Sequence, residues 1–229
     1  MSSYYTLITA LPWLPELEQC KQMPLSRIAL DQRLTMLSDQ DLEQLRLVES
    51  LYFPDSEFLQ GNTDKQLVTV WREQLGGVAS DTLLQRINFS HELMTLLAAL
   101  RSRSGGMESP DLFHGIGRWL PRIKQHWFEP GFGLEDYFPQ LSKIQRVLAK
   151  DDPALLEKVL NQMLWHDLIL CERQNHFSFE SVVCFVLRWG IAESHIQQDG
   201  TEALQKFNRL TGQLLSQAGL HQQLEQGVK

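Results

Sequence analysis

The helical spacing of apolar residues in the last third of the chain constrains the fold more than any other feature. After Asp152 and Pro153, apolar side chains recur three and four positions apart, at Leu155, Leu156, Val159, Leu160, Met163, Leu164 and Leu168. This spacing places all of them on one continuous helical face. The segment from Ser178 to Ile191 has almost no polar side, which predicts a central helix with neighbours all round it.

The same pattern extends towards the start of the chain. We expect helices to begin at residues that commonly cap helix N-termini: Ser26, Ser38, Thr63, Ser80, Ser90, Ser109 and Thr201. Pro121 should kink or end the helix that begins at Ser109. Residues Tyr4 to Leu11 mix aromatic and β-branched types, which favour a strand or an extended arm. The sequence therefore predicts an all-α, multi-helix domain with a short extended or strand-like N-terminal segment.

The length and composition suit a single domain. The chain has 229 residues, of which 43% are hydrophobic and 21% charged, so it can bury a substantial core. The small and polar residues from Ser102 to Pro110 predict a lobe boundary or a mobile hairpin tip. We expect one helical domain over residues 1–229, built of two helical lobes that divide near residues 102–110.

The charge balance excludes several classes of partner. The chain carries 21 Lys and Arg against 28 Asp and Glu, a net charge of −7, and has no run of basic residues. A chain of this kind does not favour nucleic acid or an anionic membrane surface. No stretch approaches the roughly 20 apolar residues needed to span a bilayer, so direct membrane insertion is not expected. Proteins, especially basic ones, are the expected partners.

The cysteines and the N-terminus bear on the compartment. Cys20, Cys171 and Cys184 are odd in number and do not form a disulfide framework, which favours a reducing cytoplasm. The apolar start has no basic residue before it and is broken by Pro12 and Pro15, so it is a poor signal peptide. We expect a cytoplasmic protein.

Potential metal ligands are densest in one segment, which contains His166, Asp167, Cys171, Glu172 and His176. On a helix, Glu172 and His176 share a face, whereas His166 and Cys171 do not. The chain lacks paired Glu-x-x-His elements, a His-Glu-x-x-His motif and paired Cys-x-x-Cys motifs. We therefore expect a polar cluster near a helix end, with no metal and no cofactor.

Candidate catalytic residues are as few as candidate metal ligands. His91 and His114 are potential acid/base residues, but no Gly-x-Ser-x-Gly motif accompanies them. The sequence Gly115-Ile116-Gly117 lies in a helical pattern without the rest of a phosphate-binding fingerprint. We expect no enzymatic activity and no catalytic residues. A helical enzyme that uses His114 or the 166–176 cluster is the alternative.

Two charged residues lie among apolar neighbours: Glu92, in a leucine-rich helix, and Arg188, in the most apolar one. Because a buried charge is tolerated mainly when it is paired, each should meet an opposite charge in another helix, and one hypothesis pairs them with each other. The alternative is that both reach solvent from helix ends.

Aromatic residues in weakly patterned segments have two interpretations. Core filling is the favoured interpretation for Trp13, Trp119, Trp127 and Phe132. Phe128 and Phe132 lie in an expected loop and are candidates for contact with a partner protein.

Three sequence segments carry a family resemblance. They are the opening Tyr4-Tyr5-Thr6-Leu7-Ile8-Thr9-Ala10-Leu11-Pro12, then Phe89-Ser90-His91-Glu92 followed by Leu97-Ala98-Ala99-Leu100-Arg101, and finally Phe179-Glu180-Ser181 followed by Leu187-Arg188-Trp189. With these residues the chain resembles an uncharacterised bacterial family that is encoded in V-type (A/V-type) ATPase operons, where the C-type (or d-type) component of the central stalk would be expected.

The resemblance implies a function that involves no catalysis. A C-like component of the central stalk would be all-helical and would link the central rotor axle to the membrane ring of proteolipid subunits. Its partners would be V-type ATPase rotor subunits, and it would lie in the cytoplasm, peripheral to the membrane through that complex. The alternative is a free-standing helical adaptor or regulator unrelated to the ATPase. Both are protein-binding functions.

Overall fold

The computed structural model describes residues 2–198. Within this range the regular structure is helical and contains no strand, which confirms the all-α prediction. The α-helices are α1 (Ser2–Ala10), α2 (Arg27–Leu34), α3 (Asp39–Tyr52), α4 (Ser56–Gly61), α5 (Asp64–Leu75), α6 (Asp81–Ser104), α7 (Leu120–Gln125), α8 (Leu141–Leu148) and α9 (Pro153–Gln174), and the 3-10 turns are η1 (Leu17–Gln19) and η2 (Pro110–Leu112). A further helix covers residues 179–198, where the described part of the chain ends.

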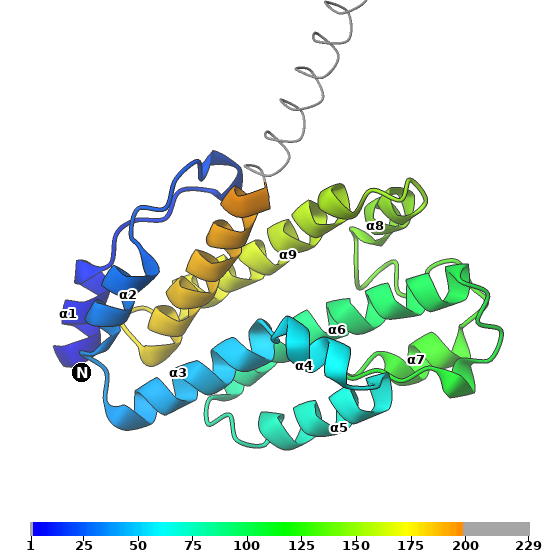
Figure 1. Ribbon diagram of the computed structural model, residues 1–229, viewed down its shortest axis with the longest axis horizontal. Helices are drawn as coiled ribbons and strands as arrows, with labels where there is room; N and C mark the ends of the chain where they lie inside the picture. Colours follow the sequence, from blue (N-terminus) through cyan, green and yellow to red (C-terminus); the bar gives the residue numbers. More distant parts are fainter. Residues whose placement is uncertain (1, 199–229) are drawn as a thin grey trace, which may run out of the picture.

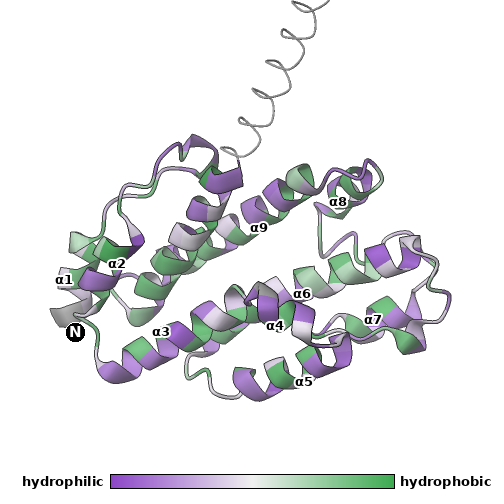
Figure 2. Ribbon diagram, in the orientation of Figure 1, coloured by the Kyte–Doolittle hydropathy of each residue, from purple (hydrophilic) through white to green (hydrophobic). Residues whose placement is uncertain are grey.

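The long helix α6 holds the elements together. It packs against α3, α7 and α9, while α3 also contacts α5, and α8 contacts α9. Helix α9 and the 179–198 helix form a helical hairpin, beside which α1 and α2 lie at one end of the molecule (Figure 1). The helices in Figure 2 mix hydrophilic and hydrophobic residues, as expected of helices with one buried face.

Two hydrophobic cores lie along the body. The first contains residues of α1, α2, α3 and α5, the start of α6, the end of α9, and the 179–198 helix. The second contains the rest of α6, the start of α9, and residues between 113 and 147. Both long helices therefore contribute to both cores. Residues 102–110, the predicted lobe boundary, lie between Leu100 and Phe113, which both belong to the second core.

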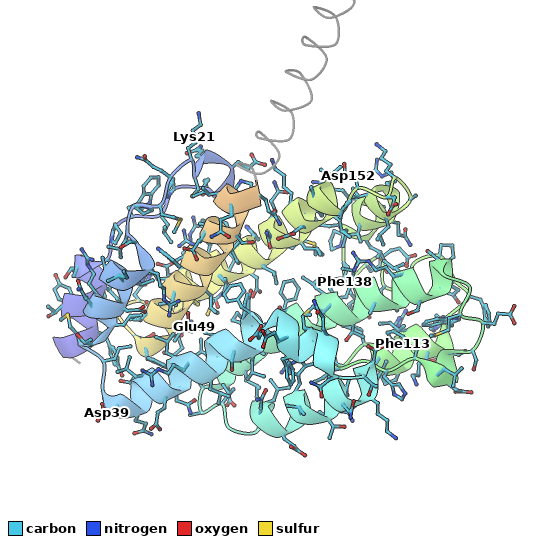
Figure 3. The ribbon with its side chains drawn as sticks, viewed as in Figure 1. Lys21, Asp39, Glu49, Phe113, Phe138 and Asp152 are labelled. Atoms are coloured by element: carbon cyan, nitrogen blue, oxygen red, sulfur yellow. The ribbon has the colours of Figure 1, made fainter. Side chains whose placement is uncertain are left out.

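Most expected helix starts are confirmed by their caps. The side chains of Ser26, Ser38 and Ser80 each accept a hydrogen bond from a backbone N–H three residues later. Thr63 forms a complete capping box with Gln66. Asp152, labelled in Figure 3, accepts from the Leu155 N–H at the start of α9.

The N-terminal segment differs from the prediction. Residues 2–10 form helix α1 and not a strand or an extended arm. The described chain offers no strand for pairing, so packing decides the conformation. Leu7 is fully buried in the first core, and the Tyr4 hydroxyl donates a hydrogen bond to Asp41 Oδ2 at 2.8 Å. Burial and the neighbouring Asp41 raise the pKa of Tyr4 to about 12.

Two of the predicted helix starts within the described residues, at Ser90 and Ser109, are also wrong. Ser90 is buried in the middle of α6, which runs unbroken from Asp81 to Ser104. The segment that starts at Ser109 forms only the short turn η2 (Pro110–Leu112), because the next residue, Phe113, takes an extended conformation with φ −77° and ψ 128°. Pro121 lies in the first turn of α7, where its missing N–H costs nothing. The helix expected from Thr201 lies outside the described residues.

Over residues 2–198, no helix is both long enough and apolar enough to cross a membrane.

Candidate functional site

An open groove lies between the N-terminal segment and the helical hairpin. Two adjoining pockets of about 430 and 470 Å³ share Glu16, Ile169 and Arg173, and we call them together the arm groove. The N-terminal segment supplies one wall, with Trp13 and Leu14 among its residues. Helix α9, the turn after it and the 179–198 helix supply the other wall, which includes His176 in the turn and Arg188 in the second helix.

Arg188 joins the three segments of the arm groove. It is 8% exposed, and its Nη1 donates to Glu172 Oε2 of α9 at 2.5 Å. Its Nη2 lies 3.5 Å from the carbonyl oxygen of Leu14, and its guanidinium lies 4.5 Å from the ring centroid of Trp165. Its Nε has no hydrogen-bond partner among the described residues. A buried guanidinium of this kind fixes the N-terminal segment against the hairpin.

Glu92 and Arg188 are both buried and both paired, but not with each other. Glu92 is 5% exposed, and its Oε1 lies 3.3 Å from Arg118 Nε and accepts the Arg118 backbone N–H at 3.2 Å. Arg188 pairs instead with Glu172. The hypothesis of a mutual pair is therefore wrong. Arg118 lies in a turn outside the helices, so helical spacing gives no indication of its position.

Helix α6 also anchors the loop that contains Gly115-Ile116-Gly117. The Thr95 hydroxyl donates to the Ile116 carbonyl at 2.8 Å and accepts the Ile116 N–H at 3.0 Å. A Cβ at Gly117 would lie 2.4 Å from Glu92 Cγ. The two glycines therefore let the loop lie close against α6.

The 166–176 cluster divides between surface and interior. His166, Glu172 and His176 line the arm groove, whereas Asp167 binds Arg86 at 2.5 Å and Cys171 is buried. Burial raises the pKa of Asp167 to about 6, although Arg86 opposes the rise. Nowhere in residues 2–198 do three His, Cys, Asp or Glu side chains come together as a metal site would require.

The two phenylalanines expected to contact a partner have opposite surroundings. Phe128 is 80% exposed. Phe132 is fully buried against Trp127, because its positive φ of 56° turns the chain back towards the second core. Phe132 is thus a core residue and is not available to a partner.

Sequence reasoning missed the most prominent aromatic residue of the arm groove. Trp13, expected in the core, is 78% exposed on the wall of the groove. Tyr5 of α1 and Phe177 of the hairpin turn are also exposed, and their ring centroids lie 5.0 Å apart. The signal for Trp13 was its place between Pro12 and Pro15, which prevents a helix and holds the segment extended.

Comparison with known proteins gives a family. No curated protein and no solved structure matches the chain. Residues 56–218, more than half of the chain, match the family described as "Protein of unknown function (DUF2764)". The chain therefore belongs to the DUF2764 family.

Proposed function

We propose that this chain is a non-enzymatic helical adaptor that binds a partner protein in the arm groove. One observation carries the proposal: Trp13 is 78% exposed beside an open groove in which Arg188 is held by an ion pair. Tryptophan and arginine are the side chains that most often dominate the binding energy of protein interfaces. A partner that covers Trp13 would remove a large apolar surface from water.

The finer proposal is a C-like accessory or central-stalk subunit of a V-type ATPase, which links the rotor axle to the membrane ring. Its support is the sequence resemblance, and two of the resembling segments meet at the arm groove. The opening segment contributes Ile8, Leu11 and Pro12, and the late segment contributes Ser181 and Arg188.

Two properties of the whole chain agree with such a role. The helices α6 and α9 run through both cores, which stiffens the body along its length. The net charge of −7 would favour association with basic surfaces of a partner. A free-standing adaptor or regulator would use the same groove, and only the identity of the partner separates it from the ATPase subunit.

Isolation of the complete tagged chain from its native cells tests both levels of the proposal. We expect V-type ATPase axle or ring subunits to co-purify with it. Trp13→Ala should reduce the recovered partner at least about tenfold, since loss of an interface anchor costs roughly 2 kcal/mol or more. Because Trp13 is so exposed, the variant should retain the thermal stability of the original chain.

Phe128→Ala is the matched control, because Phe128 is equally exposed and lies outside the arm groove. Loss of the partner with Phe128→Ala, but not with Trp13→Ala, would overturn the assignment to the groove. Isolation without any axle or ring subunit would overturn the ATPase proposal. A specific partner of another kind that depends on Trp13 would leave the adaptor proposal standing.

A further inference from the structure

A second pocket, on another part of the surface, gathers cationic side chains. Helix α5 contributes Lys65, Thr69 and Arg72, the 113–115 loop contributes His114, and α7 contributes Lys124. The pocket has a volume of about 250 Å³, and we call it the basic pocket. Figure 3 labels Phe113, the residue before His114, which lines the same pocket.

The basic pocket is built on a fixed frame. Phe113 is buried in the second core, with its ring centroid 5.3 Å from that of Trp127. Three residues later, the backbone of Ile116 is held by both hydrogen bonds of Thr95. On the opposite side, Lys65 and Arg72 lie two helical turns apart on α5, which places them on similar faces. The side chains that can donate hydrogen bonds thus approach from three separate elements, of which α5 and α7 supply the Lys and Arg residues.

The charges of the basic pocket are not neutralised by the protein. No carboxylate is among the residues that line it. Within residues 2–198, neither Lys65, Arg72 nor Lys124 forms an ion pair. The whole chain nevertheless has a net charge of −7, so such a concentration of unpaired positive charge runs against its overall composition. Like charges held close together repel, and a bound anion would relieve that repulsion.

We propose that the basic pocket binds a phosphoryl group, either as free phosphate or as a phosphate ester. A phosphoryl group presents at least three acceptor oxygens in different directions and carries a charge between −1 and −2 near neutral pH. Lys65, Arg72 and Lys124 can donate to it from two sides, and His114 and the Thr69 hydroxyl add further donors. A carboxylate has only two oxygens in one plane and cannot meet donors on three elements as fully. The small volume excludes a large ligand from the pocket itself.

Titration of the complete chain with inorganic phosphate and with ethyl phosphate at low ionic strength tests the proposal, by calorimetry or phosphorus NMR. We expect saturable binding that weakens as salt is added. Arg72→Met and Lys124→Met should each weaken it about tenfold, because a hydrogen bond to a charged group contributes roughly 1.5 kcal/mol or more. Tighter binding of ethyl phosphate would identify an ester as the ligand form, and tighter binding of phosphate the free ion.

Lys143→Met in α8 is the matched control, because it removes the same charge outside the basic pocket. The proposal is overturned if phosphate does not saturate, if Lys143→Met weakens binding as much as Arg72→Met, or if succinate binds as tightly as phosphate. Unchanged melting temperatures would show that the variants remain folded. Lys65→Met provides a third pocket variant if either of the others does not fold. This inference does not depend on the proposed adaptor function.

Discussion

His91 shows how one polar residue is accommodated inside the first half of the molecule. It is fully buried in α6, its ring centroid lies 4.9 Å from that of Trp71, and its Nε2 lies 2.9 Å from the Leu51 carbonyl oxygen. Since a carbonyl only accepts, Nε2 carries the proton. Nδ1 has no partner within the described chain and is therefore the unprotonated nitrogen. Burial lowers the pKa of His91, so the folded protein keeps this side chain neutral.

This residue should make stability depend on pH. In the unfolded chain a histidine titrates at about pH 6.5. Below that pH the unfolded state therefore binds a proton that folded His91 does not bind. The free energy of unfolding should therefore fall as the pH drops from about 6.5 towards the lower pKa of the folded state. His91→Gln keeps a donor for the Leu51 carbonyl but does not titrate. Urea unfolding between about pH 7 and pH 5 should show a shallower fall for the variant, and equal slopes would contradict the argument.

Gly117 is a position where even a single methyl group should destabilise the fold. Its φ is +104°, and a Cβ there would lie 2.4 Å from Cγ of the buried Glu92. Gly117→Ala should therefore lower the free energy of unfolding by about 2–3 kcal/mol, from backbone strain and steric overlap. Gly61→Ala in α4, where nothing lies within 4 Å, is the control and should not destabilise the protein. Equal stability of the two variants in urea would show that the loop can move away from α6.

At the scale of elements, Arg103 connects the end of α6 to the turn that follows α7. Its guanidinium donates to the carbonyl oxygens of Trp127, Glu129 and Pro130, and it lies 4.4 Å from the ring centroid of Phe132. A lysine ammonium is a point charge and cannot reach these three carbonyls together. Arg103→Lys should lower the free energy of unfolding by roughly 1–3 kcal/mol.

Arg101→Lys is the control for this change, because Arg101 lies exposed in the same turn of α6. It should have little effect on thermal or urea unfolding. A similar loss of stability in both variants would show that the contribution of Arg103 comes from helix composition and not from the three carbonyls.

Helices were predictable where local chemistry and packing agree. The caps at Ser38 and Thr63 and the apolar face of α9 all belong to stretches whose own residues specify a helix. Helix prediction failed where contacts with residues distant in the sequence determine the local conformation. Helix α1 forms because the first core buries Leu7, and Ser90 does not begin a helix because α6 continues past it. A single sequence does not contain those contacts explicitly.

At the scale of the whole molecule, the two cores should unfold together. Leu168 lies in the first core and Ile144 in the second, and α6 and α9 contribute residues to both. Leu168→Ala and Ile144→Ala should each cost about 2–5 kcal/mol. In calorimetry and circular dichroism, each should shift one cooperative transition to lower temperature. Two separate transitions, of which each variant moves only one, would contradict this expectation.

The candidate sites were less predictable than the fold. The basic pocket joins residues 65, 72, 114 and 124, and the sequence between them contains no basic run, so its charge is concentrated only by folding. The arm groove joins Trp13 to Arg188 in the same way. The apolar neighbours of Arg188 predict either a buried, paired charge or a side chain that reaches solvent, and the structure shows the first. Its partner Glu172 is not predictable from those neighbours, because it depends on how the hairpin closes.

The passage of α6 and α9 through both cores makes the described body indivisible. Any cut of the chain between these two helices leaves each fragment with one long helix whose apolar face has lost its counterpart. Neither fragment can then bury its apolar side chains in a complete hydrophobic core. Each fragment should therefore aggregate alone and regain structure only when it is mixed with the other. The smallest piece of this architecture that folds by itself therefore includes both long helices.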